Sequence, residues 1–374
     1  MILTSDTEIT TWNMGSAFDN RNSLVCNAWK IDNEPTRCDP TISELFTSLF
    51  KTCSLVVLFN AKFDLHWYRK SGISLNNISI WCCQLAEFYL ENQRNPYPSL
   101  EETAIKYGLG HKIDVIKTDY WDKGINTNEI PTNVLYPYAI QDVDLTYKIY
   151  LEQVKQFKTK PALYKLFRLA CQDLLVLQEM EWNGLKVDVT LMQKTSEELD
   201  EKIKTVLDPL KEVYPNVVIN FGSGYQLSSF LYGGTIKEEF KEHCGFYKTG
   251  AKAGQPKYKW VEKETTLPRL IEPIKGSELA KEGFFATNED VLKKLKGPNA
   301  KKFVAPLLEY AKLEKLNSTY YKGMLTRMQE YNWTDGVLHG QFNQCVTITG
   351  RLSSSKPNQQ NLAGDCLNIF ISRF

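Results

Sequence analysis

Acidic residues recur in three segments of the first 150 residues, and this pattern constrains the fold and the chemistry of the chain more than any other feature. Asp6 and Glu8 form the first segment, residues 60–64 the second, and Tyr138 with Asp142 the third. The β-branched residues around Asp6 indicate a strand, in which residues i and i+2 leave the same face. Tyr138 and Asp142 lie in a helical pattern, where an i, i+4 spacing places them on one side. Both pairs can therefore point into one cavity.

These residue types are the components of a site that hydrolyses phosphodiester bonds with two metal ions. Mg²⁺ prefers hard oxygen ligands and keeps several waters, so a few carboxylates and a substrate phosphate can hold two ions; Mn²⁺ can substitute. Because a free phenol has a pKa of about 10, Tyr138 is a poor general base, and we expect it to orient the attacking water. Taken singly, an Asp-x-Glu or a Tyr-x-x-x-Asp is usually an exposed pair. The inference depends on the ordered set of three segments.

That ordered set resembles the 3′–5′ exonuclease domain of family A DNA polymerases, in the variant with tyrosine in its third motif. The resemblance implies a water-positioning tyrosine at Tyr138 and metal ligands at Asp6, Glu8, Asp64 and Asp142. Asn60 and Phe63 also fit the second motif, as motif positions rather than ligands. One departure is visible at Cys82-Cys83, where relatives commonly read Asp-Thr before Gln-Leu-Ala. This departure puts only the local packing in question, because the replaced aspartate is not a metal ligand.

A second resemblance lies in residues 339–361, where the run TITGRLSSSKPNQQN is similar to the family's palm motif, TGRLSS followed by PNLQN. In the family this stretch lies along the minor groove near the primer terminus. The resemblance implies DNA contacts by Arg351, Asn358, Gln360 and Asn361. Arg and Gln donors suit the acceptors that every base pair presents in the minor groove. Read without the family, the segment is a polar loop.

The middle of the chain has helical patterns. Apolar spacing predicts helices over residues 163–188, ending near Gly184, over 190–212, and from Gly222 onward. A long helix over about 299–330 resembles the family's thumb helix. The resemblance implies contacts with the duplex backbone by Lys315, Ser318 and Thr319, and a charged, solvated helix face is the equally weighted alternative.

Residues 235–285 differ from their surroundings, since they combine several glycines and lysines with short β-prone runs such as YKWVEKETTL. We interpret them as a hairpin-bearing insertion in the thumb. A passive loop is the favoured interpretation of its role. A contact with DNA or with an accessory protein is the alternative.

The predicted fold begins with an α/β, ribonuclease-H-like exonuclease domain over residues 1–158, with a mixed sheet and flanking helices. A mainly helical thumb over 159–335 and a partial α+β palm over 336–374 follow. Strands are predicted over residues 2–10, 23–32 and 54–60, and helices over 41–52, 62–71, 82–92, 98–108 and 132–158.

Charge and composition agree with a protein that cuts and holds DNA. Residues 1–150 carry 13 Lys and Arg against 18 Asp and Glu, whereas residues 151–374 carry 32 against 26, so the acidic part suits cations and the basic part suits phosphates. The nine cysteines show no paired framework and no signal peptide is visible, which predicts reduced thiols and a cytoplasmic location. If the gene is from a bacteriophage, this would be the cytoplasm of its bacterial host. No apolar run is long enough for a membrane helix, and a zinc site is not expected.

The expected function is that of a 3′–5′ proofreading exonuclease in DNA replication, acting on a single-stranded 3′ end while thumb and palm hold the primer–template duplex. In the family, the palm continues beyond the position of Phe374 into the aspartates that bind the polymerising metals. We therefore expect no polymerase activity from these residues alone, and a C-terminal polymerase polypeptide as partner. A free-standing 3′–5′ DNA exonuclease and a non-catalytic DNA-binding remnant are the alternatives.

Overall fold

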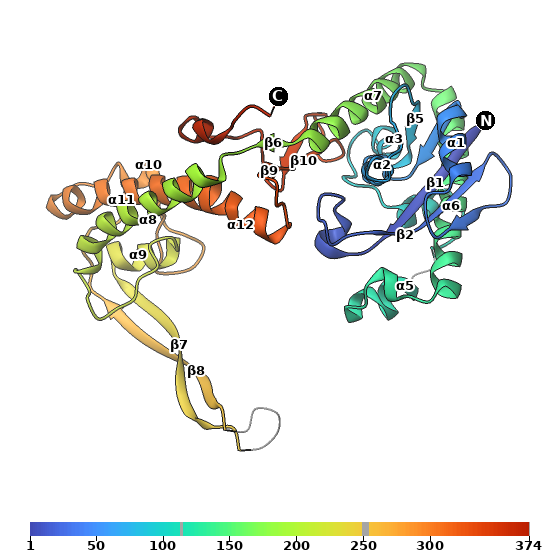
Figure 1. Ribbon diagram of the computed structural model, residues 1–374. Coiled ribbons are helices and arrows are strands. Elements are labelled where there is room, and N and C mark those ends of the chain that lie inside the picture. Colours follow the sequence, from blue (N-terminus) through green and yellow to red (C-terminus); the bar gives the residue numbers. More distant parts are fainter. Residues whose placement is uncertain (113–114, 249–253, 374) are drawn as a thin grey trace. The chain divides into compact units, whose positions relative to one another are not determined.

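The chain is described by a computed structural model that covers residues 1–112, 115–248 and 254–373 (Figure 1). Its contacts define two compact units: Met1–Val189 with Met324–Phe374, called unit 1, and Thr190–Gly323, called unit 2. The boundaries predicted at residues 158 and 335 separate an exonuclease domain, a thumb and a palm, and a division of the chain by contacts does not test that assignment. They stay predictions.

A five-stranded mixed sheet lies at the centre of unit 1, with the strand order β3-β2-β1-β4-β5. Antiparallel pairing joins β1 to β2 and β2 to β3, whereas β1, β4 and β5 run parallel. The α/β fold class with a mixed sheet is confirmed. The strands are β1 (Ile2–Ile9), β2 (Leu24–Ile31), β3 (Arg37–Asp39), β4 (Leu55–Leu58) and β5 (Ile80–Cys82).

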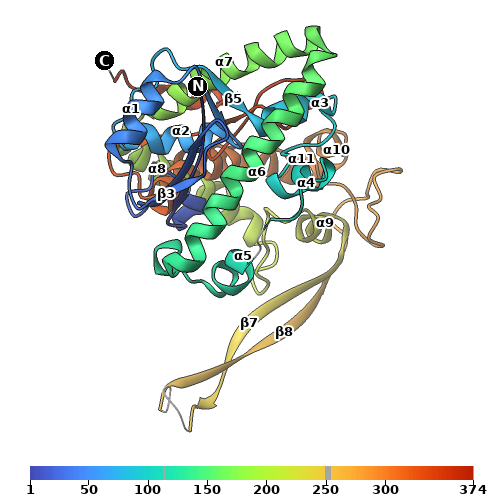
Figure 2. The ribbon, with the colours of Figure 1, turned by 90° about the vertical axis from the view of Figure 1, so that its right-hand side faces the viewer.

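Helices cover both faces of this sheet, and Figure 2 shows the long helix α6 running across the strands. Cys26 and Ala28 of β2 belong to a buried cluster with side chains of α6, whereas Leu3 and Trp29 belong to a cluster with Tyr68 of α2. Alternate residues of each strand therefore face different helices. The helices are α1 (Glu44–Thr52), α2 (Ala61–Lys70), α3 (Cys83–Leu90), α4 (Leu100–Lys106), α5 (Val115–Asp119), α6 (Thr132–Lys158) and α7 (Pro161–Asn183), with 3₁₀ turns at Trp12–Gly15, Trp121–Lys123 and Thr127–Glu129.

Short strands from the C-terminal residues complete unit 1. Strand β6 (Leu185–Lys186) pairs with β9 (Val337–Leu338), and β10 (Gln341–Asn343) pairs with β11 (Ser353–Ser355), both antiparallel. Gly184 ends α7 with a φ of +61°, and an added Cβ would lie 2.7 Å from the carbonyl oxygen of Leu338. Only glycine fits both this backbone conformation and this close approach.

The buried carboxylate of Glu181 joins helices α2 and α7 to strand β10. Its Oε1 lies 2.5 Å from Nζ of Lys62 and accepts a 2.6 Å hydrogen bond from the backbone N–H of Phe342, while its Oε2 lies 2.9 Å from Nε2 of His66. Burial alone would raise the pKa of Glu181, but the hydrogen bond from His66 and the charge of Lys62 outweigh it and lower the pKa. Glu181 is therefore held ionised among its donors.

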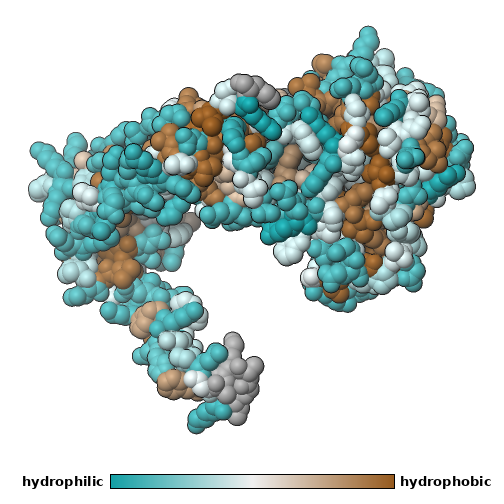
Figure 3. All heavy atoms as spheres, in the orientation of Figure 1, coloured by the Kyte–Doolittle hydropathy of each residue, from teal (hydrophilic) through white to brown (hydrophobic). Residues whose placement is uncertain are grey.

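Unit 2 packs its helices around buried aromatic and aliphatic residues, among them Phe230, Phe303 and Leu307. A two-stranded antiparallel hairpin, β7 with β8, extends from these helices (Figure 1), and the face drawn in Figure 3 is mostly hydrophilic along it. The elements are α8 (Val189–Lys211), α9 (Gly224–Tyr232), β7 (Gly234–Phe246), β8 (Pro256–Leu267), α10 (Glu289–Leu292), α11 (Pro298–Leu316), a π-helical turn (Asn317–Tyr321) and α12 (Lys322–Glu330), whose last residues belong to unit 1.

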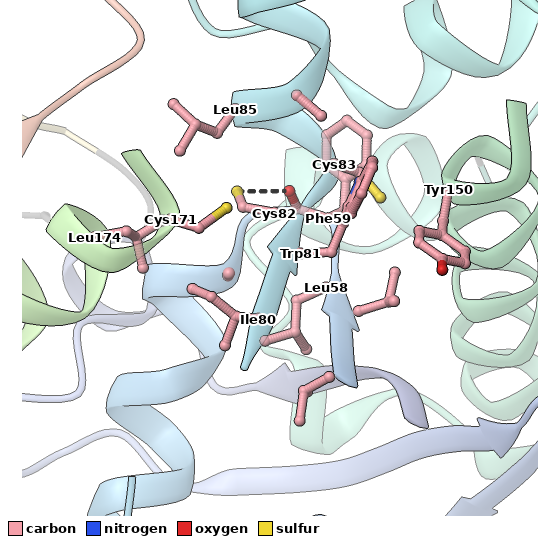
Figure 4. Packing of buried hydrophobic residues seen from close by; sticks show 14 of the residues in the cluster. Leu58, Phe59, Ile80, Trp81, Cys82, Cys83, Leu85, Tyr150, Cys171 and Leu174 are labelled. Carbon is pink, nitrogen blue, oxygen red and sulfur yellow. Dashed lines mark hydrogen bonds between the residues drawn. The ribbon is translucent and has the colours of Figure 1, made fainter. Parts of the chain in front are cut away.

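The Cys82-Cys83 pair, where the sequence departs from the family resemblance, lies in the core at the junction of β5 and α3 (Figure 4). The Cys82 thiol donates to the carbonyl of Phe59 at 3.3 Å, and the Cys83 thiol donates to that of Thr146 at 3.7 Å. Burial raises the pKa of both thiols. They behave as small apolar residues, so the departure is accommodated by ordinary core packing.

The strands and helices predicted from the sequence occur in the structure, including the hairpin and the helix from Pro298 to Glu330, which a π-helical turn interrupts. The sequence analysis missed the short strands β3, β5 and β6 and the short helices α5 and α10, because two to five residues are too few for a periodic pattern. Strand β6 occupies the end of the range 163–188, which was predicted to be helical. In the described parts of the chain, no helix is both long and apolar enough to cross a membrane.

Removing the Glu181 carboxylate should destabilise unit 1. In a Glu181→Ala chain, Lys62 would lose its charged partner while its side chain stays largely buried, so we expect a loss of about 3 kcal/mol in the free energy of unfolding. Urea unfolding followed by tryptophan fluorescence measures it, since seven of the eight tryptophans lie in unit 1.

Glu179→Ala is the matched control, because Glu179 lies two residues earlier on α7 and is 53% exposed in its pair with Arg69. Its loss should be below about 1 kcal/mol. Equal losses in the two variants would contradict a special role for the buried carboxylate.

Candidate active site

Strand β1 and helix α6 bring two pairs of predicted residues to the same place. Asp6 lies opposite Ala28 and Glu8 opposite Cys26 in the register of β1 and β2, and both partners face α6. Directly opposed residues of an antiparallel pair share a face of the sheet, so Asp6 and Glu8 also point toward α6. From that helix, Tyr138 and Asp142 project one turn apart.

The carboxylates of Asp6, Glu8 and Asp142 form a cluster in which one oxygen from each residue lies within 4.8 Å of the others. The second observation is that Oδ1 of Asp142 is buried and has no hydrogen-bond partner within the described chain. A buried acceptor without a donor is unfavourable, and oxygen atoms of this kind suit a hard divalent cation. The three residues therefore fit a Mg²⁺ or Mn²⁺ ion.

Asp64 reaches the same region from helix α2, on the opposite face of the sheet. Its Oδ1 accepts hydrogen bonds from the backbone N–H of Thr7 at 3.1 Å and from the Thr7 hydroxyl at 2.7 Å. Because Thr7 lies between Asp6 and Glu8, it faces α2 rather than α6. One oxygen of Asp64 is thus occupied by protein donors, and the residue lines the same cavity as Asp6 and Glu8.

Lys112 and Tyr138 form the opposite wall, together with Trp121. Nζ of Lys112 lies 2.5 Å from Oδ2 of Asp142 and 4.3 Å from the centroid of the Tyr138 ring. The ring of Trp121 meets that of Tyr138 edge to face at 6.2 Å between centroids. Tyr138 is consequently held between a cation and an indole, with its side chain 5% exposed.

All five predicted residues line one cavity of about 350 Å³. Asn60 and Phe63, the further motif positions of the second segment, line it as well, and so do Met14 and Lys112. The cavity is therefore lined by both acidic and apolar side chains, which suits a nucleotide whose phosphate needs cations and whose base needs an apolar contact.

Burial raises the pKa values of all four carboxylic acids, and repulsion by the neighbouring carboxylates adds to this effect at Asp6 and Glu8. Desolvation, followed by the charges of the neighbouring carboxylates, raises the pKa of Asp6 well above its ordinary value. Burial and then the charge of Asp142 raise the pKa of Glu8 to about 8. Burial raises the pKa of Asp64 to about 7 despite the Thr7 hydrogen bonds, and that of Asp142 to about 6 despite Lys112. The protein alone holds too much negative charge here, and bound cations would relieve it.

The remaining predicted residues lie outside this cavity. The segment around β11 holds four of them, all exposed: Arg351, Asn358, Gln360 and Asn361. The side chain of Asn358 accepts a hydrogen bond from the backbone N–H of Gln360 at 3.0 Å. In unit 2, Lys315, Ser318 and Thr319 are exposed on and next to the π-helical turn.

The sequence analysis missed Lys112, Thr7 and Trp121. No motif identifies Lys112, since it lies in a Gly-His-Lys run between helices and only tertiary packing brings it to Asp142. Thr7 had a readable signal, because its position between two carboxylates of one strand places it on the other face.

Two family models match the chain in succession. The model described as 3′–5′ exonuclease matches residues 7–158, and the model described as DNA polymerase family A matches residues 189–367. The first match begins within β1, so it covers the rest of the sheet and every residue that lines the acidic cavity except Asp6. The second spans the helices of unit 2 and the short strands β9, β10 and β11.

Curated relatives are DNA polymerases. DNA polymerase I of Synechocystis sp. is 28% identical over 82% of this chain and 27% of its own length, and DNA polymerase I of Bacillus subtilis is 28% identical over 82% and 29%. A DNA polymerase of an Escherichia phage is 24% identical over 83% of this chain and 34% of its own length. The chain thus spans between a quarter and about a third of these relatives.

One solved structure, the POL domain of Pol1 from M. smegmatis in complex with DNA primer–template and dNTP, shares the fold with a TM-score of 0.67. The likeness covers 96% of this chain and 52% of that one, at 18% identity. This likeness supports the fold, whereas the relationship to DNA polymerases rests on the two family models.

The raised pKa values predict how stability depends on pH and metal. Between about pH 4 and pH 8 the folded, metal-free chain keeps protons that the unfolded chain has released, so its stability should fall as the pH rises. Mn²⁺ needs ionised ligands and should raise the midpoint of thermal unfolding more at pH 8 than at pH 6. Thermal unfolding in EDTA and in Mn²⁺ at both pH values measures this.

The control is the doubly substituted chain Asp6→Asn with Glu8→Gln, which keeps the shapes and removes two charges. It should be more stable than the parent in EDTA at pH 8 and should lose most of the shift with Mn²⁺. A full shift in this variant, or an equal shift at both pH values in the parent, would argue against the carboxylate cluster as the metal site.

Proposed function

This chain belongs to DNA polymerase family A over residues 189–367 and carries that family's 3′–5′ exonuclease domain over residues 7–158, and on this premise we propose that its acidic cavity hydrolyses the 3′-terminal phosphodiester bond of DNA. The products would be a 5′-mononucleotide and a strand one nucleotide shorter. In replication, this reaction would be proofreading.

The observation that carries the proposal is the convergence of Asp6, Glu8 and Asp142 within 4.8 Å, in a cavity that Asp64 and Tyr138 also line. A fold needs no such arrangement, because burying four carboxylic acids raises the pKa of each and is costly. Two divalent cations, Mg²⁺ or Mn²⁺, when held by these carboxylates, would supply Lewis acid activation of a water and stabilisation of the leaving oxygen. The four carboxylates fit that demand and argue against a non-catalytic remnant.

Tyr138 is suited to position the attacking water rather than to take its proton. Its ring contacts both Trp121 and Lys112, and these two contacts fix its position in the lining of the cavity. A phenol in that place orients a water by hydrogen bonding. The water attacks phosphorus, the bond from phosphorus to the 3′ oxygen breaks, and that oxygen takes up a proton.

Lys112 provides the cationic group of the chain itself at this site. In its contact with Asp142 it compensates part of the charge of the carboxylate cluster. A flexible ammonium group can also move from a carboxylate to a phosphate, so Lys112 is suited to hold the phosphate of the penultimate nucleotide. Asn60, Phe63 and Met14, which also line the cavity, would contact the sugar and base of the 3′ end.

The exposed polar residues of the palm and thumb segments are proposed as contacts to a primer–template duplex. Arg351, Asn358, Gln360 and Asn361 would serve the minor groove, and Lys315, Ser318 and Thr319 the phosphate backbone. Polymerase activity belongs to the full-length relatives, of which this chain spans less than two thirds. A C-terminal polypeptide that completes a polymerase stays a prediction, and a free-standing exonuclease is the alternative.

The purified chain should shorten 5′-labelled single-stranded DNA from its 3′ end in Mg²⁺ or Mn²⁺. The Asp6→Asn, Glu8→Gln chain should lose at least about 10³-fold in rate, because two of the cluster's three ligands lose their charge. Gel analysis of the products over time measures both. Asp144→Asn is the matched control, since Asp144 lies on the same helix as Asp142 but pairs with Lys30. The site assignment is wrong if the doubly substituted chain is as active as this control.

Tyr138→Phe should separate water positioning from metal binding. We expect the rate to fall by about 10²-fold, because an orienting hydroxyl is lost, while the Kd for Mn²⁺ stays within about twofold of the parent. Asp142→Asn should instead weaken Mn²⁺ binding. Isothermal titration with Mn²⁺ and single-turnover kinetics give the two quantities. Equal weakening of Mn²⁺ binding in both variants would refute this division of roles.

A further inference from the structure

The hairpin of β7 and β8 carries rings and cations on one face, in unit 2 and outside the acidic cavity. Lys241 lies opposite Trp260, and His243 lies opposite Tyr258, in the antiparallel register. Residues two apart on a strand leave the same side, so these four side chains form one surface, which we call the hairpin face. Trp260 is 67% exposed and Tyr258 53% exposed.

Contacts within the hairpin face do not explain this exposure. Nζ of Lys241 lies 5.1 Å from the centroid of the Trp260 ring, and the rings of His243 and Tyr258 lie 5.7 Å apart. Such cross-strand pairs stabilise a hairpin by roughly 0.2–1 kcal/mol, which smaller β-forming residues also provide. Both rings keep more than half of their surface available to a ligand.

Charge is segregated along the hairpin. The half nearer the helices, residues 234–239 and 262–267, has two lysines against four glutamates, and Lys237 is paired with Glu262 and Glu264. The outer half, residues 240–248 and 254–261, has four lysines against one glutamate. The exposed rings lie in this outer, basic half. The ligand that suits it is therefore an anion.

The chemistry of the hairpin face favours a nucleic acid strand over a protein. Figure 3 shows only small hydrophobic patches on the drawn face of the hairpin, whereas the centre of a protein interface is normally a larger apolar area. Exposed rings beside lysines are the usual means of binding single strands, because every unpaired base can stack on a ring and every nucleotide carries a phosphate. Bases of a duplex are already stacked on one another.

We propose that the hairpin face binds single-stranded DNA, with bases stacked on Tyr258 and Trp260 and a phosphate neutralised by Lys241, in the basic outer half of the hairpin. This site is separate from the acidic cavity and does not depend on its activity. It would hold a strand without selecting its sequence, since stacking and charge are common to all nucleotides.

The test is the affinity of the full chain for 5′-labelled dT20, measured by fluorescence anisotropy in EDTA. A Tyr258→Thr, Trp260→Thr chain should bind at least about tenfold more weakly, because two stacking rings are lost. Threonine keeps the β-forming tendency of these positions. Phe240→Thr with Val261→Thr is the matched control, since this cross-strand pair lies on the other face of the same hairpin and should leave the affinity unchanged.

Two further measurements keep the proposal falsifiable if the ring variant alters the hairpin itself. Lys241→Gln should reduce the slope of log Kd against log salt by about 0.7, while Lys237→Gln, which lies on the same face in the inner half, should not. A dT20 strand that contains 5-iododeoxyuridine should crosslink under ultraviolet light to the peptide with Tyr258 and Trp260, as mass spectrometry would show.

Equal affinity of the two threonine variants, or an unchanged salt slope, or crosslinks confined to peptides outside the hairpin, would each overturn the proposal. The proposal would also be overturned if a protein bound the hairpin face and substitution of Trp260 left the affinity for dT20 unchanged. The affinity for a duplex of the same length should be unchanged in the Tyr258→Thr, Trp260→Thr chain. This comparison separates base stacking from general electrostatic attraction to DNA.

Discussion

Repulsion among buried carboxylates is the constraint on which the architecture of unit 1 depends. Asp6, Glu8 and Asp142 lie within 4.8 Å of one another, and the pKa values of the acids are raised because the cavity removes water and adds like charges. Such a cluster persists only when a rigid scaffold holds it. The central strand β1, hydrogen-bonded on both sides, and the long helix α6 provide that rigidity.

The scaffold distributes these acids over both faces of one strand. Asp6 and Glu8 face helix α6, while Thr7 between them binds Asp64 from helix α2. The alternation of a β-strand thus lets two helices on opposite sides of a sheet contribute to one cavity at the strand's end. A helix in place of β1 would present residues i, i+1 and i+2 around about half of its circumference and could not do this.

Helix α2 also takes part in the Glu181 contacts, and this joins the cavity to the C-terminal strands of unit 1. Lys62 and His66, which bind Glu181, lie on the same helix as Asp64, and Glu181 also accepts from the backbone of Phe342 in β10. The position of Asp64 is therefore tied to strand β10 through one buried, ionised residue. A buried ion pair of this kind contributes to a defined arrangement more than to net stability.

The sequence could predict the longer elements, the α/β class and the five residues that line the cavity together, because periodicity, turn residues and the spacing of acids are local properties. Strand β1, helix α6 and the β7–β8 hairpin are readable in this way. It did not determine Lys112 beside Asp142, the Thr7 hydrogen bonds to Asp64, or the Glu181 contacts, whose partners are 30, 57 and up to 161 residues apart. The short strands β3 and β5 were likewise unreadable, since pairing with β2 and β4 rather than their own few residues defines them. Only the tertiary structure decides such contacts, because the free energy of burying a charge depends on what the fold places next to it, and no local pattern records that neighbour.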